Sequence, residues 1–410
     1  MPDIGTIVII GAGHAGGRAA ETMRQAGYTG AITLIGEEAH VPYERPPLSK
    51  ELLAGDEAVD KTFLNPLGFY DENGIELRLE THAQAIDRDN HNVRLADGNS
   101  LAYDRLLICT GARVRRLRCR GADLAGIHYI RTIDDTLALR PALKDGARVV
   151  VVGGGFIGLE VASSARARGA KVTVVELADQ VLARVTDPAV GDLVADLHRA
   201  NGVHVMTGVT VERIGGNGRA AEVICSDGET IAADVVVVGI GILPNQEIAA
   251  RAGLNTADGI IVDEFGRTSD GDIFAAGDVA FHYNPILGRH LRLESWANAQ
   301  NGGIAVARNM VSEPTPYAEL PWFWSDQFDL NLQLVGVPET WDRLVTRGDP
   351  KSGRCVIFYM QGNRVTGATT FNQGREMRSC RRLIESGMEV ADEVLCDEAT
   401  RLRDVVQGQG

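Results

Sequence analysis

A short apolar run that ends in closely spaced glycines occurs twice in the chain. Residues 7–16 read IVIIGAGHAG, and residues 149–158 read VVVVGGGFIG. Each is followed by a stretch of helical pattern and then by a second apolar run, which ends at Glu37 in the first copy and at Glu176 in the second. Apolar runs of this length between turn residues are typical of buried strands. Each copy is therefore predicted to fold as a strand, a helix and a parallel strand.

The glycines in both copies have the G-x-G-x-x-G spacing of a dinucleotide site. The first glycine allows the tight turn, the second lets the backbone approach a pyrophosphate, and the third lets the helix pack closely on the strand. The pyrophosphate then lies at a helix N-terminus, and an acid about 20 residues further on binds the adenosine ribose. One copy alone is weak evidence, because packing also favours glycine at such turns. Two complete copies predict two bound dinucleotides, with Gly11, Gly13 and Gly16 in the first turn and Gly153, Gly155 and Gly158 in the second.

The acid of the second copy indicates which nicotinamide nucleotide binds there. Sites for NADP commonly carry an arginine near this position to hold the 2′-phosphate, whereas a glutamate repels that group. After Glu176 the chain has no basic residue until Arg184. We therefore expect NADH rather than NADPH. The alternative is that Glu176 is only a solvated carboxylate at the end of a strand.

Three further segments predict buried strands. Residues 104–111 (DRLLICTG) follow the first copy, and residues 233–245 (ADVVVVGIGILPN) are their counterpart after the second. Residues 268–278 (TSDGDIFAAGD) predict a short strand that ends at Gly277 and Asp278. An acid in such a place can bind a ribityl hydroxyl, or it can cap a helix N-terminus.

From about Pro321 the sequence changes character. Residues 321–371 alternate in the manner of antiparallel strands. A helical pattern follows over residues 373–386, and its basic residues are Arg375, Arg378, Arg381 and Arg382. We expect an α/β fold with two Rossmann-like dinucleotide-binding domains and a C-terminal α+β domain. The predicted boundaries are 1–112 with 247–320 for the first, discontinuous domain, 113–246 for the second and 321–410 for the third.

Composition and charge narrow the range of functions. The 410 residues include 55 Asp and Glu against 41 Lys and Arg, a net charge of −14, so the summed field repels nucleic acids and anionic membranes. The sequence has no apolar stretch of about 18 residues, and its N-terminal apolar run lacks the flanks of a signal peptide. Six cysteines without C-x-x-C spacing predict neither a disulfide framework nor a bound metal. We expect a cytoplasmic protein.

Four motifs add a family resemblance that covers essentially the whole chain. They are residues 42–50 (PYERPPLSK), 129–132 (YIRT), 293–300 (LESWANAQ) and 321–327 (PWFWSDQ). Together with the two dinucleotide copies, they resemble the glutathione-reductase-like flavoproteins and, within these, the NADH-dependent ferredoxin reductases of oxygenase systems. The resemblance implies FAD in the first domain, NADH in the second and a C-terminal domain that caps the flavin.

The resemblance also implies roles for single residues. Lys50 would lie near the flavin N5 atom and pair with Glu160, and these two are the predicted catalytic residues. Without the resemblance, Lys50 could be a solvated charge or part of a structural ion pair, Arg131 a surface residue and Trp296 a core aromatic. The predicted FAD-binding residues are Gly11, Gly13, His14, Ala15, Glu37, Arg45, Lys50, Ala83, Thr110, Gly111, Arg131, Gly277, Asp278, Ser295 and Trp296. The predicted NAD-binding residues are Gly153, Gly155, Phe156, Ile157, Gly158, Glu160, Glu176, Ile240 and Gly241.

The positions of cysteine and histidine separate the subfamilies of these flavoproteins. Disulfide reductases need a cysteine pair early in the first domain, and peroxidases need a single cysteine there, but the first cysteine here is Cys109 and the last histidine is His290. The resemblance then implies that electrons pass from NADH through FAD to a [2Fe-2S] ferredoxin, which supplies a cytochrome P450 or a Rieske-type aromatic-ring dioxygenase. The alternatives are an NADH oxidase and a redox sensor similar to apoptosis-inducing factor.

An acidic ferredoxin can dock on this acidic chain only at a local basic patch. We favour the arginines of the predicted C-terminal helix over an earlier arginine cluster at the domain junction. Trp324 is a candidate for the wall between the flavin and its partner, or else a buried tryptophan of a small sheet. The type of oxygenase stays open, as does the choice between a monomer and a homodimer. The earlier cluster consists of Arg113, Arg115, Arg116, Arg118 and Arg120.

Overall fold

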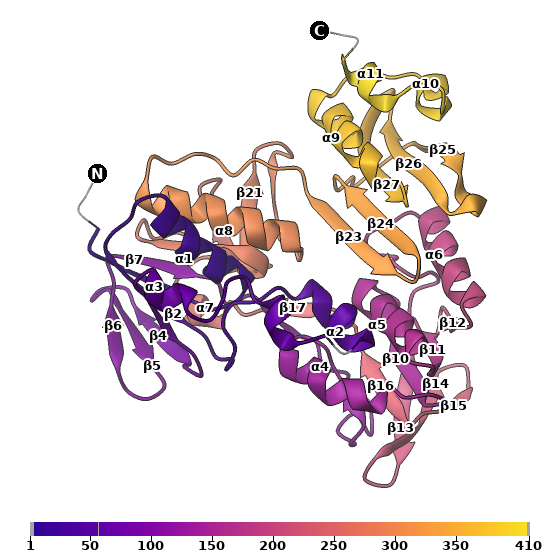
Figure 1. The fold of residues 1–410 in the computed structure, drawn as a ribbon, viewed down its shortest axis with the longest axis horizontal. Coiled ribbons are helices and arrows are strands. Elements are labelled where there is room, and N and C mark those ends of the chain that lie inside the picture. The colour runs from indigo at the N-terminus through magenta and orange to yellow at the C-terminus, as the bar shows by residue number, and fades with distance from the viewer. Residues whose placement is uncertain (1–3, 56, 408–410) are drawn as a thin grey trace. The chain divides into compact units, whose positions relative to one another are not determined.

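The computed structural model describes residues 4–55 and 57–407, which divide into two compact units (Figure 1). Within the described residues, the first unit is drawn from residues 4–45, 59–113 and 243–321, and the second from residues 46–55, 57–58, 114–242 and 322–407. The chain passes from one unit to the other after residues 45, 58, 113, 242 and 321, and the third and fourth of these passages lie within β8 (Ala112–Val114) and β17 (Ile242–Pro244). Within the described residues, no helix combines the length and the apolar character needed to span a membrane.

A parallel sheet of five strands forms the centre of the first unit, in the order β20-β7-β1-β2-β3. The apolar run of β1 is continuous because its side chains point alternately to two cores. Ile7 and Ile9 pack in one hydrophobic cluster, and Val8 and Ile10 pack in the other. The strands of this sheet are β1 (Thr6–Ile10), β2 (Ala31–Ile35), β3 (Ile75–Arg78), β7 (Arg105–Ile108) and β20 (Ile273–Ala275).

Helices α1 (His14–Gln25) and α8 (Trp296–Val311) lie side by side in this unit (Figure 1). They approach closely because Gly303 has no side chain, and a Cβ there would lie 2.7 Å from the carbonyl oxygen of Ala15. The first unit also contains α3 (Phe69–Glu72), α7 (Glu247–Arg251), a three-stranded antiparallel sheet of β4 (Ala83–Asp87), β5 (Asn92–Leu95) and β6 (Ser100–Ala102), and a four-stranded mixed sheet of β18 (Thr256–Ala257), β19 (Gly259–Val262), β21 (Ala280–Asn284) and β22 (Arg289–Leu291).

The second unit contains a second parallel sheet of the same kind, in the order β12-β11-β10-β16-β9. Its central strand β10 pairs with β11 and β16, just as β1 pairs with β2 and β7. The strands are β9 (Ile127–His128), β10 (Arg148–Val152), β11 (Lys171–Val175), β12 (His204–Met206) and β16 (Val235–Val238). Around them are α2 (Glu51–Ala54), α4 (Ile133–Leu139), α5 (Phe156–Ala167), α6 (Pro188–Ala200) and the antiparallel strands β13 (Val211–Gly216), β14 (Ala220–Cys225) and β15 (Thr230–Ala232).

The C-terminal part of the second unit is an antiparallel sheet in the order β23-β24-β27-β26-β25, as the alternating pattern predicted. The predicted helix over residues 373–386 is present as α9, but it begins at Met377 because residues 374–376 form a 3₁₀ turn. The elements are β23 (Trp322–Gln327), β24 (Leu330–Val335), β25 (Arg343–Asp349), β26 (Arg354–Gln361), β27 (Arg364–Phe371), α9 (Met377–Ser386), α10 (Asp392–Cys396) and α11 (Leu402–Gln407).

The two units are coarser than the three domains that the sequence predicted. The described residues of the segments 46–58 and 322–407 group with the second parallel sheet, whereas we expected the first segment in the first domain and the other in a domain of its own, 321–410. The three-domain boundaries stay a prediction.

Candidate functional site

Both glycine-rich turns require glycine at their first and third positions. Gly11 has a φ of +115°, and Gly153 has a φ of +110°, a region that residues with a side chain rarely adopt. At the third position, a Cβ on Gly16 would lie 2.0 Å from the Gly11 carbonyl oxygen, and a Cβ on Gly158 would lie 2.0 Å from that of Gly153. The tight turn and the close packing of helix on strand explain these four glycines.

The middle glycines have a different environment. A Cβ on Gly13 or on Gly155 would meet no atom within 4 Å. Each of the two is the N-cap of a 12-residue helix, α1 or α5, and makes no side-chain cap hydrogen bond. The first N–H groups of a helix have no partner within the helix, and the space beside both N-cap glycines is open, which is the arrangement that binds a pyrophosphate. Both turns fit the phosphates of a dinucleotide.

The acids at the ends of the second strands lie in unlike surroundings. Glu176 accepts hydrogen bonds from the backbone N–H groups of Gly154 (2.5 Å) and Ala178 (2.8 Å), so it is fixed to the glycine-rich turn and is not merely solvated. Glu37 is 69% exposed, and its Oε1 lies 2.5 Å from Nδ1 of His82. Glu37 thus keeps carboxylate lone pairs open to a ribose, while Glu176 also braces the turn.

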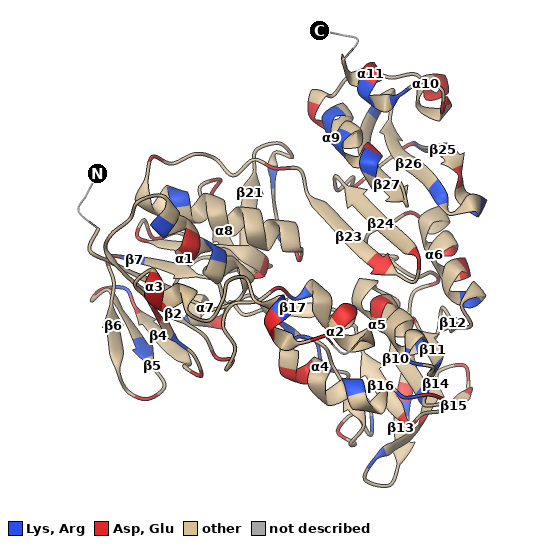
Figure 2. Cartoon of the chain, in the orientation of Figure 1, with Lys and Arg blue, Asp and Glu red and all other residues tan. Residues whose placement is uncertain are grey.

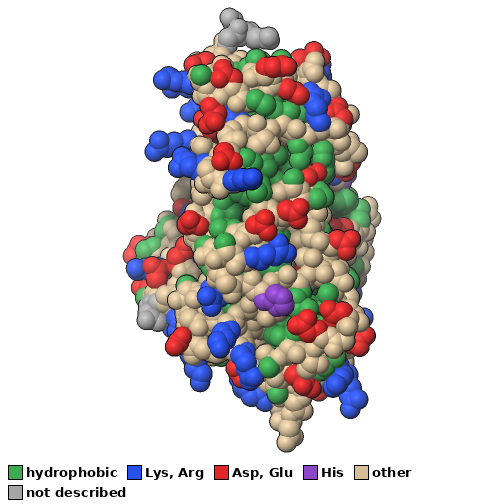
Figure 3. All heavy atoms as spheres, turned by 90° about the vertical axis from the view of Figure 1, so that its right-hand side faces the viewer, with side chains coloured by type: hydrophobic (Ala, Val, Ile, Leu, Met, Phe, Trp, Pro, Cys, Tyr) green, Lys and Arg blue, Asp and Glu red, His purple; other side chains and the backbone are tan. Residues whose placement is uncertain are grey.

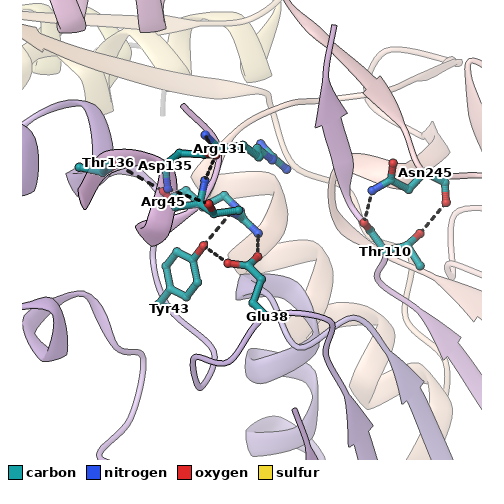
Figure 4. Close-up of polar contacts among 9 residues, drawn as sticks. Glu38, Tyr43, Arg45, Thr110, Arg131, Asp135, Thr136 and Asn245 are labelled. Carbon is teal, nitrogen blue, oxygen red and sulfur yellow. Dashed lines mark hydrogen bonds and ion pairs between the residues drawn. The ribbon is translucent and has the colours of Figure 1, made fainter. Parts of the chain in front are cut away.

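In the segment after β2, Arg45 of the first unit lies in a network of hydrogen bonds (Figure 4). Arg45 donates through Nη2 to Oε1 of Glu38 (2.9 Å) and through Nη1 to the hydroxyl of Tyr43 (2.9 Å). The Tyr43 hydroxyl in turn donates to Oε2 of Glu38 (2.5 Å). This network fixes the direction of the guanidinium, which suits it to hold a phosphate.

Thr110 and Asn245 tie two loops of the first unit together (Figure 4). The Thr110 hydroxyl donates to the Asn245 carbonyl (2.8 Å), and the Asn245 side chain donates to the Thr110 carbonyl (2.9 Å). Gly111 follows with a φ of +61°, so it turns the chain directly after β7. Gly277 and Asp278 follow β20 closely, and Gly277 has a φ of +77°. Asp278 lies within a 3₁₀ turn whose N-cap is Ala276, so Asp278 does not cap a helix.

His14, at the start of α1, is fixed against the start of α8. Its Nε2 lies 2.7 Å from Oε1 of Gln300, and its ring meets the Trp296 ring edge to face at 5.3 Å. Burial lowers the pKa of His14. Ser295 caps α8 by accepting a hydrogen bond from the N–H of Asn298 (3.2 Å). The predicted residues Ser295 and Trp296 therefore order the beginning of this helix. Ala83, another predicted FAD-binding residue, lies buried at the start of β4.

The predicted ion pair between Lys50 and Glu160 is present in the second unit. Nζ of Lys50 lies 3.6 Å from Oε1 of Glu160 and 3.6 Å from Oδ2 of Asp326. The Lys50 side chain is 10% exposed, so its alternative reading as a solvated charge is wrong. Its Nζ also lies 5.3 Å from the ring centre of Trp324, which stacks on Trp322. Three groups therefore hold one ammonium in a fixed place.

Glu160 is buried on α5 and receives two hydroxyl hydrogen bonds. Ser49 donates to Oε2 (2.5 Å) and Ser325 donates to Oε1 (2.6 Å). Burial raises the pKa of Glu160, and Lys50 and the two serines oppose that rise. The backbone of Ser49 is held in turn by Ser164, whose hydroxyl donates to the Ser49 carbonyl (2.6 Å). The ion pair is thus supported on both carboxylate oxygens.

Sequence reasoning missed Ser49, Ser325 and Asp326 as members of this cluster. All three lie inside the motifs PYERPPLSK and PWFWSDQ, which were the available signal, but no contact could be assigned to them. Each of the three contacts a side chain that is distant in sequence, as Ser325 contacts Glu160 across 165 residues.

The start of α5 and the loop after β16 hold the remaining predicted NAD-binding residues. The Phe156 and Phe323 rings lie 4.3 Å apart, and Ile157 beside them is 45% exposed. Gly241, which follows Ile240, has a φ of +98°, and a Cβ there would lie 3.4 Å from the Arg184 guanidinium. Arg131 lies before α4, where its N–H donates to Oδ2 of Asp135 (3.0 Å; Figure 4).

Comparison with known proteins finds relatives over the whole chain. The profile of the family described as pyridine nucleotide-disulphide oxidoreductase matches residues 5–303, and the profile described as reductase C-terminal matches residues 322–406. The chain is 43% identical over 399 residues to the anthranilate 1,2-dioxygenase system ferredoxin–NAD(+) reductase component of Burkholderia cepacia, which covers 97% of this chain and 98% of that relative.

Two solved structures are similar over almost the whole chain. The ferredoxin reductase for the CYP199A2 system from Rhodopseudomonas palustris has a TM-score of 0.95 and 40% identity, covering 98% of this chain and 99% of that one. Putidaredoxin reductase in its covalent complex with putidaredoxin has a TM-score of 0.96 and 36% identity, covering 98% of both chains. These matches confirm the predicted α/β fold class with a C-terminal domain, and the predicted resemblance to ferredoxin reductases.

Proposed function

Because the chain belongs to the pyridine nucleotide-disulphide oxidoreductase family, we propose that it is a ferredoxin reductase, which moves electrons from NADH through FAD to a [2Fe-2S] ferredoxin. FAD and NAD(H) are its cofactors. The ferredoxin then supplies a cytochrome P450 or a Rieske-type dioxygenase, and the reductase works in the cytoplasm. The observation that carries the proposal is the full-length similarity to ferredoxin reductases of oxygenase systems, C-terminal domain included.

The cysteines support direct transfer from the flavin to an outside carrier. All six lie within the described residues and none is in a disulfide. Cys109, the first in the chain, is buried, and burial raises its pKa to about 12. A thiol with that pKa is not a thiolate at neutral pH, so it is inert in thiol exchange.

Bound FAD supplies the electron chemistry, since a flavin accepts two electrons together and releases them singly. The chain supplies position and charge. In this proposal the turns at Gly13 and Gly155 hold the pyrophosphates of FAD and NADH. Lys50, held by Glu160 and Asp326, would supply a positive charge to the bound flavin, and Phe156 would contact the nicotinamide.

A basic patch on α9 is the favoured ferredoxin site. Arginines recur along this helix (Figure 2), and Arg378 and Arg382 are exposed. Arg381 is engaged with Glu385 (2.9 Å). In the earlier cluster, Arg113 pairs with Glu247 (2.6 Å), so part of that cluster already has an acidic partner. On the face drawn in Figure 3, basic and acidic side chains are interspersed.

Steady-state reduction of cytochrome c, with and without an added [2Fe-2S] ferredoxin, tests the proposal. The FAD-loaded protein is expected to reduce cytochrome c from NADH at a rate that rises with ferredoxin and saturates. Rapid oxygen uptake with no dependence on ferredoxin would instead identify an NADH oxidase. A long-lived complex of reduced protein and NAD⁺ that reacts with neither acceptor would identify a redox sensor.

A further inference from the structure

A continuous chain of buried side chains runs away from Glu160 on the side opposite Ser49. Ser325 donates to Oε1 of Glu160 (2.6 Å), and Nε2 of Gln327 donates to the Ser325 hydroxyl oxygen (2.9 Å). Oε1 of Gln327 lies 2.8 Å from Nε2 of His198. Ser325, Gln327 and His198 are completely buried, and Glu160 is 3% exposed. The chain joins α5, β23 and α6 within the second unit.

The donors in this chain can point in only one direction when Glu160 is ionised. A carboxylate only accepts hydrogen bonds, so Ser325 has to donate its proton to Glu160. The Ser325 oxygen then accepts from the Gln327 amide, which leaves the Gln327 carbonyl oxygen to face His198. That oxygen also only accepts, so His198 carries its proton on Nε2. Every link therefore has one donor and one acceptor.

The far end of the chain favours a neutral His198. Its Nδ1 has no hydrogen-bond partner among the described residues. A protonated ring would place a buried N–H there with no acceptor, which is costly. Burial also lowers the pKa of His198, while the contact with Gln327 partly opposes this. In this site the ring is a fixed donor through Nε2.

The turn after Gln327 holds the chain in place. Phe328 has a φ of +54°, an uncommon value for an aromatic residue, and its N–H donates to the hydroxyl of Ser163 (2.7 Å). Its ring packs against His198 at 5.0 Å. Ser163 lies on α5, one helical turn beyond Glu160. The segment from Ser325 to Phe328 therefore contacts α5 at two places, Glu160 and Ser163.

We propose that Ser325, Gln327 and His198 are positioning residues that keep Glu160 ionised and directed at Lys50. The inference rests on the proposed function, because the ion pair matters only if Lys50 serves the flavin. His198, about two residues from the C-terminal end of α6, then influences the reaction with NADH without touching either cofactor. Reversal of any link would leave Ser325 without a proton for the carboxylate and favour protonation of Glu160.

The first test measures the rate at which NADH reduces the FAD-loaded protein by stopped flow across a range of pH. Protonation of Glu160 produces an acid limb in this profile. In Ser325→Ala the limb is expected to move up by about one pH unit, because a hydrogen bond to a charged group is lost. His198→Leu shifts it in the same direction by less. His198→Gln, which retains an N–H donor, and Ser325→Thr, which retains the hydroxyl, restore the wild-type limb.

Thr370→Val is the matched control. Thr370 is fully buried in β27 of the same unit, and its hydroxyl has no partner among the described side chains. This variant is expected to keep the wild-type profile. Rates that fall equally at every pH in Ser325→Ala and His198→Leu, with the acid limb unmoved, would overturn the proposal in favour of a purely structural role.

A second measurement does not depend on activity. The holoprotein is labelled with ¹⁵N-histidine, and the His198 signals are assigned as those missing from His198→Gln. We expect a neutral ring with its proton on Nε2 from about pH 5.5 to about pH 8. A proton on Nδ1, or titration within that range, would contradict the proposed chain of hydrogen bonds from His198 to Glu160. This result does not depend on whether NADH reduces the protein. A failure of the hydrogen-bond proposal can therefore be distinguished from a failure of the proposed function.

Discussion

The open space at the middle glycine of each turn leads to a sharp prediction about two neighbouring glycines in the second unit. Gly155→Ala places a methyl group where no atom lies within 4 Å, in an extended backbone (φ −79°, ψ 178°) that alanine adopts freely. Alanine restricts the conformations of the unfolded chain, which stabilises the folded variant by about 0.4–1 kcal/mol. Alanine is also a poorer N-cap than glycine, which offsets a few tenths of a kcal/mol of that gain. The free energy of unfolding should therefore change by less than about 1 kcal/mol.

Nucleotide binding should nevertheless fail in this variant. If the space belongs to the pyrophosphate, the new methyl group occupies it and keeps the backbone N–H groups at a distance. We expect the Kd for NAD⁺ to rise at least tenfold, which is about 1.4 kcal/mol. Gly158→Ala is the matched contrast, because its Cβ would lie 2.0 Å from the Gly153 carbonyl oxygen. That overlap forces α5 away from β10 and should cost about 3 kcal/mol of stability.

The assay combines urea unfolding of the FAD-loaded variants with calorimetric titration of NAD⁺. The predicted pattern is a stable Gly155→Ala that binds NAD⁺ poorly and a Gly158→Ala that unfolds at lower urea. Wild-type NAD⁺ affinity in Gly155→Ala would refute the assignment of this space to the pyrophosphate. A Gly158→Ala as stable as the wild type would refute the packing argument.

Three further predictions concern nucleotide choice, acid stability and ferredoxin docking. Glu176→Ala removes a carboxylate fixed to the Gly154 N–H, so the kcat/KM preference for NADH over NADPH should fall about tenfold; an unchanged ratio would contradict the role of that charge. Burial lowers the pKa of His282 to about 4, so protonation of this residue favours the unfolded state. The free energy of unfolding should therefore fall by about 3 kcal/mol as the pH drops from about 6.5 toward 4. Urea unfolding at both pH values should show a smaller loss in His282→Phe, and an equal loss would exclude this residue as the cause. Charge reversal at Arg378 and Arg382 should raise the ferredoxin KM about tenfold and leave NADH–dye reduction unchanged; an unchanged KM would eliminate α9 as the docking site.

The parts of the fold that repeat a local pattern could be predicted from the sequence. Apolar runs bounded by glycines became β1 and β10, and the alternating C-terminal pattern became β23 to β27. These predictions hold because each depends on residues that are neighbours in the chain. The 3₁₀ turn before α9 was missed, because residues 374–376 share the helical pattern of the residues after them.

The candidate site was only partly predictable, because its contacts join distant segments. The Lys50–Glu160 pair was expected from a family resemblance and is present, although its catalytic role stays a prediction. His198 and Gln327 are 129 residues apart, and no local pattern indicates that they meet. The turn at Phe328 has a positive φ without glycine, so the usual sequence signal for such a turn is missing.

Electron transfer to a ferredoxin is the central claim, and an anaerobic stopped-flow experiment tests it most directly. The FAD-loaded protein is first reduced with one equivalent of NADH and then mixed with oxidised [2Fe-2S] ferredoxin. We predict that the flavin absorbance returns while the ferredoxin absorbance bleaches, with about two ferredoxins reduced for each NADH because each cluster takes one electron. A flavin that stays reduced until oxygen is admitted, with the ferredoxin unchanged, would contradict the account.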